Sequence, residues 1–297
     1  MRLYAYRARP DEPAVGPDSL RARTGRPFPL PIPIAPGVHL TARAEDAHGH
    51  PAAPAVSAPG KIVCIGLNYR DHVEEQHIPL PDRPVLFAKF ANALVADGEP
   101  IVRPPGTHAL DLEVELGVVI GRPARRVPAE RAMDVVAGYV AVNDVSARNW
   151  QGQKAALREG ERGDGQWLRA KGSDTFLPMS ATFVSADEIP DPHALRLRSW
   201  RIPGTGPDAG REILMQDGTT ANMIFRIPEL IAYVTSQITL EPGDVVATGT
   251  PSGVGVFRDP PVFLEPGDRV RVEVERVGSV ENPVVDWTAD PRPQPEA

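Results

Sequence analysis

Residues Leu110–Gly121 read Leu-Asp-Leu-Glu-Val-Glu-Leu-Gly-Val-Val-Ile-Gly. The first half of this stretch alternates apolar and acidic residues, and a period of two is typical of a β-strand. Asp111, Glu113 and Glu115 therefore lie on one face of the predicted strand. The second half contains the apolar triplet Val118–Ile120, which indicates burial on both faces.

Three carboxylates along one side of a strand repel one another. Buried acids must be neutralised, paired or bound to a metal, and oxygen ligands suit hard divalent cations such as Mg²⁺, Mn²⁺ or Ca²⁺. The alternative is an amphipathic strand with a solvated acidic face, because half-exposed antiparallel strands are common. On this stretch alone, both interpretations stay open.

The composition narrows the class of protein. The chain has 297 residues, of which 41% are hydrophobic and 24% charged, so it can form one large domain plus a small one. A net charge of −7 without any basic run argues against nucleic acid and anionic membranes as partners. No apolar stretch approaches the roughly 20 residues of a membrane span, and Met1–Arg7 lacks the apolar region of a signal peptide. A single cysteine, Cys64, excludes intramolecular disulfides. We therefore expect a soluble, cytoplasmic protein.

Lysine is rare in this chain. Only four of the 32 basic residues are lysines, namely Lys61, Lys89, Lys154 and Lys171. Because arginine supplies most of the positive charge, a remaining lysine is a candidate for a role that needs a compact ammonium. Lys89 stands inside the apolar run 84–90, where an ammonium is unfavourable unless it meets an anion. It could meet a substrate carboxylate or one of the acids above, or its stem could simply extend to solvent.

The chain divides into three parts by composition. Residues 1–57 form a small Pro-rich N-terminal unit with a linker, residues 58–287 form the main domain, and residues 288–297 form a polar tail expected to be disordered. In the main domain we expect strands at 61–66, 84–90 and 139–144 and helices at 128–137 and 228–236. Strands dominate and Gly/Pro turns are frequent, which predicts a β-rich α+β domain with helices packed outside the sheets.

Two further motifs carry possible chemistry. His72 and Glu75 lie three residues apart on a short predicted helix that Asn68 can cap. A histidine held by a carboxylate is a serviceable general base, although many such pairs are only surface contacts. Asp144 ends the predicted strand 139–144. A carboxylate at this position can complete a metal site begun elsewhere, or it can serve as a turn residue.

These motifs, in this order, resemble the fumarylacetoacetate hydrolase family. The resemblance spans about residues 60–285 and rests on five stretches: Gly66–His72 with Glu75, Asp111–Glu115, Asn143–Gln151, Lys171–Pro178 and Gly249–Gly255. Three stretches also resemble one particular branch of the family: Val145–Gln151, Val254–Arg258 and Pro260–Leu264.

The resemblance implies a mixed β-roll that usually forms a homodimer, with Mg²⁺ or Mn²⁺ as the usual ion. It also implies roles for individual residues. The metal ligands would be Glu113, Glu115 and Asp144, and the pair that activates water or moves a proton would be His72 and Glu75. Lys171 would contact the substrate's oxygens and Thr250 its carboxylate end, with Gly249, Lys89 and Arg148 as further candidates for substrate binding.

Substrates in the family are small 2-oxo acids and acylpyruvates. We therefore expect a divalent-metal-dependent hydrolase or lyase that acts by acylpyruvate C–C hydrolysis or oxaloacetate-type decarboxylation. The alternative within the family is a keto–enol tautomerase or isomerase of an oxaloacetate-like or 2-hydroxy-dienoate substrate. An alternative of another class is a non-catalytic, metal-stabilised binding protein, because a fold alone does not guarantee activity.

Overall fold

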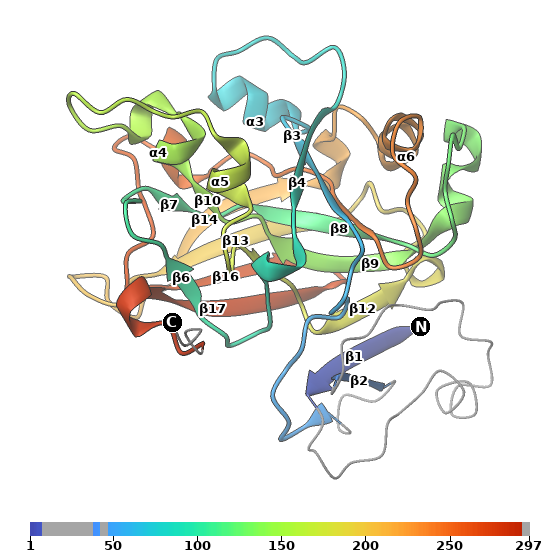
Figure 1. The fold of residues 1–297 in the computed structure, drawn as a ribbon, viewed down its shortest axis with the longest axis horizontal. Coiled ribbons are helices and arrows are strands. Elements are labelled where there is room, and N and C mark those ends of the chain that lie inside the picture. Colours follow the sequence, from blue (N-terminus) through green and yellow to red (C-terminus); the bar gives the residue numbers. More distant parts are fainter. Residues whose placement is uncertain (8–37, 42–46, 293–297) are drawn as a thin grey trace, which may run out of the picture.

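Two facing β-sheets form most of the molecule (Figure 1). The structure is a computed structural model and describes residues 1–7, 38–41 and 47–292. The larger sheet has eight strands in the order β2-β1-β12-β9-β8-β15-β3-β4, and the smaller has five in the order β14-β13-β16-β17-β6. Strands β8 and β9 of the larger sheet pack against β13, β16 and β17 of the smaller one.

The strands are short to medium in length. The larger sheet contains β1 (Arg2–Arg7), β2 (Val38–Thr41), β3 (Ile62–Gly66), β4 (Val85–Lys89), β8 (Val114–Ile120), β9 (Val136–Asn143), β12 (Thr182–Ser185) and β15 (Val245–Ala247). The smaller sheet contains β6 (Ile101–Arg103), β13 (Arg196–Ile202), β14 (Ile213–Thr219), β16 (Arg269–Val274) and β17 (Gly278–Asp286). Two pairs of very short strands complete the described set: β7 (Leu110–Asp111) with β10 (Ser146–Ala147), and β5 (Leu94–Val95) with β11 (Leu177–Pro178).

Helices lie outside the two sheets (Figure 1). The α-helices of the described residues are α3 (Arg70–Glu75), α4 (Arg148–Gln151), α5 (Trp167–Lys171) and α6 (Ile227–Thr235). Short 3₁₀ helices are at Ala91–Ala93, Ala129–Val135, Lys154–Ala156, Ala186–Glu188, Thr220–Asn222, Gly255–Phe257 and Trp287–Ala289. The sheets are mixed, since β15 pairs parallel with β3 but antiparallel with β8. This architecture confirms the predicted β-rich class with peripheral helices.

Strand β8 is the centre of the larger sheet, and all seven of its residues are buried. It pairs antiparallel with β9 on one side and with β15 on the other. The smaller sheet packs against β8, and side chains from both faces of the strand lie in hydrophobic clusters, so apolar residues are needed on both sides. The predicted burial of this segment is therefore confirmed. The solvated acidic face is excluded, since Asp111, Glu113 and Glu115 are 1%, 5% and 1% exposed.

Two local predictions were wrong. The helix expected at 128–137 is a 3₁₀ helix over Ala129–Val135, and β9 begins directly after it. Gly138, expected just past the helix end, lies inside β9, where a Cβ would come within 2.2 Å of the Val184 carbonyl oxygen. Asn68 does not cap α3, whose N-cap is Tyr69. The side-chain amide of Asn68 instead binds the Thr248 carbonyl at 2.8 Å and the backbone of Phe225. These contacts join two loops.

The described N-terminal residues add to the larger sheet. Strand β1 pairs with β12, and β2 pairs with β1 at the sheet edge. Ala53 and Val56, in the segment expected to be a linker, are fully buried. The Pro27–Pro36 segment and residues 293–297 lie outside the described residues. The division into a unit at 1–57, a domain at 58–287 and a tail stays a prediction.

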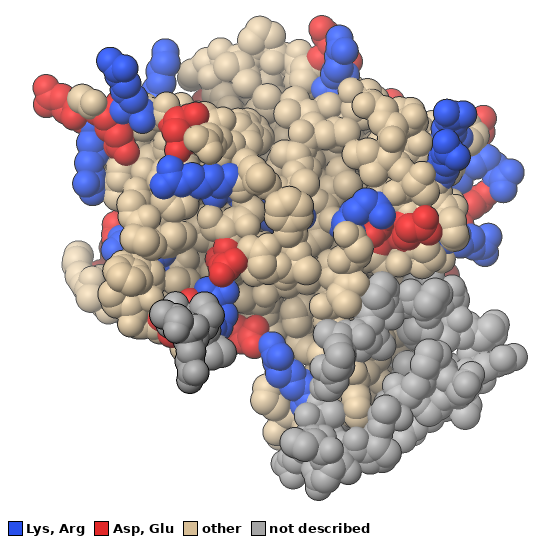
Figure 2. Space-filling view, viewed as in Figure 1, with Lys and Arg blue, Asp and Glu red and all other residues tan. Residues whose placement is uncertain are grey.

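Charged side chains are dispersed over the face shown in Figure 2, in small mixed groups of both signs. Among the described helices, none has the length and apolar character that a transmembrane segment needs.

Candidate active site

Three buried carboxylates, which we name the carboxylate floor, come from neighbouring strands. Glu113 directly precedes β8, Glu115 lies within β8, and Asp144 directly follows β9. Because Val114 is opposite Asn143 in the strand register, Glu113 and Asp144 meet, and the Asp144 N–H donates to the Glu113 carbonyl at 2.9 Å. One oxygen from each of the three side chains lies within 4.8 Å of the other two. The predicted meeting of Asp144 with the acidic strand is therefore confirmed.

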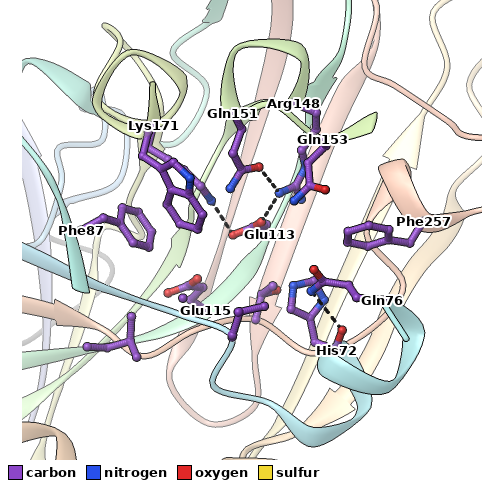
Figure 3. A pocket seen from close by; sticks show the side chains of 15 residues that line it. His72, Gln76, Phe87, Glu113, Glu115, Arg148, Gln151, Gln153, Lys171 and Phe257 are labelled. Atoms are coloured by element: carbon purple, nitrogen blue, oxygen red, sulfur yellow. Dashed lines mark hydrogen bonds and ion pairs between the residues drawn. The ribbon is translucent and has the colours of Figure 1, made fainter. Parts of the chain in front are cut away.

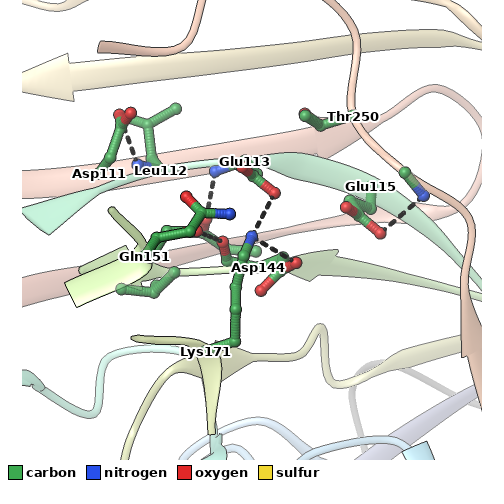
Figure 4. A network of polar contacts seen from close by, with 12 residues as sticks. Asp111, Leu112, Glu113, Glu115, Asp144, Gln151, Lys171 and Thr250 are labelled. Atoms are coloured by element: carbon green, nitrogen blue, oxygen red, sulfur yellow. Dashed lines mark hydrogen bonds and ion pairs between the residues drawn. The ribbon is translucent and has the colours of Figure 1, made fainter. Parts of the chain in front are cut away.

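Buried cations pair with two acids of the carboxylate floor, and Figure 4 shows one of them, Lys171, between Glu113 and Asp144. Lys171 Nζ lies 2.8 Å from Glu113 Oε2 and 2.9 Å from Asp144 Oδ2. Lys89 Nζ lies 2.7 Å from Asp144 Oδ1, and Arg148 Nη1 lies 2.7 Å from Glu113 Oε1. All three cations are at most 2% exposed. Pairing of this kind is what allows charged groups to remain buried.

Asp111, the third acid of the predicted strand face, does not join the floor. The strand is interrupted between β7 and β8, and Asp111 Oδ2 lies 2.8 Å from Arg148 Nε. Its carboxylate also accepts the N–H groups of Gly255 and Val256 at 2.8 and 3.0 Å. Asp111 therefore holds Arg148 and the loop at 255–256 in place.

The surroundings of Glu113 and Glu115 shift their pKa values in opposite directions. Burial alone would raise the pKa of Glu113, but Lys171 and Arg148 lower it to about 2. Burial, with the charges of Asp144 and Glu113, raises the pKa of Glu115 well above its usual range. Among the described residues, Asp111 and the three floor acids face three cations, so a fourth negative charge, on Glu115, would have no partner, in line with its raised pKa. Glu113, Glu115 and Asp144 could hold a hard divalent cation, which would supply the missing positive charge to an all-oxygen donor set.

The His72–Glu75 pair forms another part of the site. His72 Nδ1 lies 2.5 Å from Glu75 Oε1, and Glu75 Oε2 accepts the Gly253 N–H at 2.8 Å. Because a carboxylate only accepts, Nδ1 carries a hydrogen, and in the neutral imidazole Nε2 then has a lone pair that can accept a proton. The two residues lie on one face of α3, as their spacing predicts, and His72 is buried at 6% exposure. A histidine oriented in this way can take up and return a proton.

The loop at 249–255 connects the floor to the His72–Glu75 pair. The Gly249 N–H donates to Glu115 Oε2 at 2.9 Å. Gly249 has a φ of +95°, and a Cβ there would lie 2.9 Å from the Cβ of Asn68. Gly253 has a φ of +102°, and a Cβ there would lie 2.3 Å from the Met215 carbonyl oxygen. Glycine is required at both positions, because no side chain fits and the backbone is left-handed.

One pocket of about 100 Å³ lies against these groups. His72, Glu113, Glu115, Arg148, Lys171 and Thr250 line it, together with Gln76, Gln151, Gln153, Phe87, Trp167 and Phe257. Figure 3 shows His72 and Lys171 on opposite sides of Glu113. The volume suits a small acid and is well below that of a typical pocket for a drug-sized ligand.

Lys89 and Gly249 do not line this pocket, although the resemblance suggested that they bind substrate. Lys89 Nζ is enclosed by Asp144 and by the carbonyl oxygens of Val145, Lys171 and Phe176. The open question about Lys89 is thereby decided in favour of an acid of this protein. The backbone N–H of Gly249 likewise donates to the Glu115 carboxylate. Both residues contact acids of the floor and do not line the pocket.

Of the remaining predicted residues, Glu75 and Asp144 lie behind the pocket, where they contact His72 and Lys171, and the other six line it. Several lining residues were missed. Gln76, Gln153 and the aromatic rings of Phe87 and Trp167 were not singled out in the sequence, and Phe257 lay inside the branch-like stretch Val254–Arg258 without a role assigned to it. Gln151 lay inside a stretch that resembles the family, and its Oε1 accepts from Arg148 Nη1 at 3.0 Å. Such residues become recognisable only once distant segments are placed side by side.

The chain belongs to the fumarylacetoacetate hydrolase family. The sequence model described as fumarylacetoacetate hydrolase C-terminal matches residues 61–285. This result confirms the family resemblance and identifies the chain as a member of an enzyme family of hydrolases and isomerases.

Individual relatives narrow the comparison to one branch. The chain is 45% identical over 230 residues to the mitochondrial oxaloacetate tautomerase FAHD2B of Bos taurus, which covers 77% of this chain and 68% of the relative. A relative from Pongo abelii is named fumarylacetoacetate hydrolase domain-containing protein 2 and is 44% identical over 230 residues, with the same two coverages. The branch resemblance noted in the sequence is therefore confirmed, and it is the branch of this domain-containing protein 2.

A solved structure covers the chain almost completely. The 2-hydroxyhepta-2,4-diene-1,7-dioate isomerase from Mycobacterium marinum is 32% identical, with a TM-score of 0.70, and the match covers 97% of this chain and 99% of that one. The bovine relative is named as mitochondrial. For this chain, the cytoplasmic location, the homodimer and the absence of nucleic-acid and membrane partners stay predictions.

Proposed function

We propose that the protein is a divalent-metal-dependent tautomerase that interconverts the keto and enol forms of a small 2-oxo acid of the oxaloacetate type. The family resemblance placed hydrolysis or decarboxylation first and tautomerisation second. The names of the FAHD2 relatives support the reverse order. Glu113, Glu115 and Asp144 would hold Mg²⁺ or Mn²⁺, which when bound polarises a ketone oxygen and stabilises enolate charge.

The side chains of the pocket then have distinct tasks. His72 Nε2 takes a proton from the carbon next to the ketone and passes it to solvent, while the enolate oxygen takes a proton from solvent to become the enol; the reverse direction retraces both transfers, and Nδ1–H keeps its hydrogen bond to Glu75 throughout. The Lys171 ammonium provides positive charge and a hydrogen bond where the oxyanion develops. Thr250 receives the carboxylate end of the substrate. The apolar rings of Phe87, Trp167 and Phe257 limit the access of water, which would otherwise compete for these groups.

The arrangement of His72 and Lys171 on either side of Glu113 carries this proposal (Figure 3). One of these residues carries an oriented proton acceptor, and the other carries an ammonium between two acids of the floor. A proton removed on one side of a bound 2-oxo acid therefore leaves negative charge that a cation on the other side can stabilise. A binding protein that only used metal for stability would need the floor but not the His72–Glu75 pair.

The test uses enol-rich oxaloacetate and follows both ultraviolet loss of the enol and formation of pyruvate. We expect faster loss of the enol in the presence of Mg²⁺ or Mn²⁺, with no matching release of carbon dioxide. If pyruvate and carbon dioxide appear at the rate at which the enol disappears, decarboxylation replaces tautomerisation. No acceleration with either ion would refute the proposal.

C–C hydrolysis is the second candidate, because the same pair could activate water. It is also supported by the likeness to maleylpyruvate hydrolase from Sphingobium sp. SYK-6, which is 32% identical with a TM-score of 0.62 and covers 80% of this chain and 75% of that one. Turnover of acetylpyruvate to acetate and pyruvate would favour this candidate, whereas an unchanged acetylpyruvate concentration would argue against it.

A further inference from the structure

A buried glutamine of the smaller sheet contacts the site from behind. Gln216 lies on β14, is 0% exposed and uses both ends of its side-chain amide. Its Oε1 accepts the Val114 N–H and the Ser199 hydroxyl, each at 2.9 Å. Its Nε2 donates to Thr250 Oγ1 at 2.6 Å and to the Pro251 carbonyl at 2.8 Å.

Backbone groups fix the direction of this amide. The Val114 N–H can only donate, so it must face the oxygen, and the Pro251 carbonyl can only accept, so it must face the nitrogen. Gln216 therefore donates to Thr250 Oγ1. The Thr250 hydroxyl hydrogen in turn donates to the Val114 carbonyl at 2.9 Å.

The commitment of this hydroxyl changes what Thr250 can offer a ligand. Its only hydroxyl hydrogen is already used, whereas its backbone N–H has no hydrogen-bond partner in the described part of the chain. Thr250 lines the pocket and is 4% exposed. The donor that remains for an anionic oxygen at this position is therefore the backbone N–H.

We infer that Gln216 is a positioning residue for the reaction. Through Val114 it holds the backbone between Glu113 and Glu115, and through Thr250 and Pro251 it holds the loop that receives the substrate carboxylate. The inference rests on the proposed function for the identity of that ligand, a 2-oxo acid. The close approach of β14 to this loop supports it, since a Cβ on Gly218 would lie 2.3 Å from the Cβ of Pro251.

The first experiment compares Gln216→Met with Asn282→Leu. Asn282 is a matched control because it is equally buried and its amide also donates to two carbonyls, those of Ala96 and Glu99, at 2.7 Å each, but it does not line the pocket. Calorimetry gives the Kd of Mn²⁺, and then the Kd of oxalate, an enolate mimic, at saturating Mn²⁺. Melting temperatures are measured in parallel.

We expect Gln216→Met to weaken oxalate binding about tenfold or more, because it loses the hydrogen bonds that hold the loop and the strand. Mn²⁺ binding should weaken by a smaller factor. Asn282→Leu should lower the melting temperature but leave both Kd values within about twofold, since the two hydrogen bonds that it breaks lie away from the pocket. Unchanged Kd values in Gln216→Met, or equal changes in both variants, would overturn the inference. Failure of the unmodified protein to bind Mn²⁺ and oxalate would instead refute the proposed function.

If Gln216→Met does not fold, Thr250→Val takes its place in the experiment. This variant removes the hydroxyl through which Gln216 acts and keeps the backbone N–H. A loss of oxalate affinity of about threefold to tenfold supports the inference, as expected for one neutral hydrogen bond of the scaffold. A loss above about a hundredfold would mean that the hydroxyl itself holds the anion. No loss would mean that the hydrogen bond between Gln216 and Thr250 does not contribute to oxalate binding. Either of these results overturns the inference.

Discussion

The carboxylate floor and the His72–Glu75 pair belong to one site, but they are held in place by different means. The floor comes from adjacent strands, and buried lysine and arginine side chains pair with its acids. The pair lies on α3, a helix of six residues, and Glu75 is tied to the loop by one backbone N–H. The Asp144 side chain is 0% exposed, whereas that of Glu75 is 18% exposed.

Because of this difference, substitutions in the floor and in the pair should affect different properties of the protein. The floor is part of the charged interior, so its substitution should change both ion affinity and the free energy of unfolding. The pair lies at the edge of the pocket, so its substitution should change turnover with little effect on either. Variants that affect one property without the other are therefore the way to test the comparison.

The largest effect is expected for His72→Ala. Removing a general base typically lowers the rate about 10²–10⁴-fold, while Mn²⁺ affinity and melting temperature should stay close to those of the unmodified protein. Enol turnover, calorimetry and thermal unfolding measure the three quantities. His77→Asn is the control, because His77 is exposed, follows α3 and has a φ of +55° that asparagine tolerates. Undiminished turnover in His72→Ala would remove His72 from the mechanism.

Lys89→Met tests the stability of the floor. Removing the Lys89 ammonium takes a hydrogen-bond donor from the buried Asp144 carboxylate and from three carbonyl oxygens. We expect a loss of about 3–5 kcal/mol in the free energy of unfolding, as is typical when one partner of a buried ion pair is removed. Denaturant unfolding measures this change.

Lys61→Met is the matched control for Lys89→Met. Lys61 also pairs with a buried aspartate, Asp244, at 2.8 Å, but its own side chain is 36% exposed. Solvent screening should keep its contribution near 1 kcal/mol or less. Equal losses in the two variants would contradict the special role of buried charge in the floor.

The placement of Glu113 and Glu115 on one face was predictable from the sequence for a physical reason, whereas the burial of these acids and the role of Asp144 stayed open. The alternation of Glu113 and Glu115 with apolar residues places both acids on one face of a strand through local periodicity alone. Asp144 stands where another strand ends, and the antiparallel register of two adjacent strands brings it opposite Glu113. His72 and Glu75 are likewise related by local helical spacing.

The partners of the floor were not predictable in the same way. Whether Lys89 meets a substrate or an acid depends on a contact with Asp144 that is distant along the chain. Gln216 gave no signal because its four contacts come from segments separated by up to a hundred residues. Gly138 was misread because glycine at a close approach between strands cannot be told from glycine at a helix end by sequence alone.

Glu113→Gln should weaken Mn²⁺ binding about a hundredfold, since it replaces a charged oxygen ligand with a neutral amide of the same shape. Calorimetry measures the Kd. Glu265→Gln is the control, because Glu265 pairs with Arg103 at the surface and is 55% exposed. If the two variants bind Mn²⁺ equally well, Glu113 is not a ligand, and the separation between floor and pair loses its basis.

The smallest effect is expected for His193→Gln. This variant tests a pH dependence of stability that could be mistaken for a property of the His72–Glu75 pair. A fall in turnover at low pH can come from protonation of a base or from loss of folded protein. His193 contributes to the second cause: burial and the nearby Arg226 lower its pKa, and its Nε2 accepts the Ile227 N–H at the start of α6. Because the pKa of His193 is lower in the folded protein than in the unfolded chain, its protonation does not change stability at pH values above the unfolded pKa of about 6.5.

As the pH falls below that value, the unfolded chain binds a proton that the folded protein resists, so stability decreases. His193→Gln keeps an acceptor for the Ile227 N–H but has no charge to gain. The melting temperature of the unmodified protein should therefore fall more steeply than that of His193→Gln between about pH 6.5 and 5. Parallel melting curves in the two proteins would contradict this assignment. Turnover of His193→Gln over the same range then reports protonation within the pocket without the contribution of this histidine to unfolding.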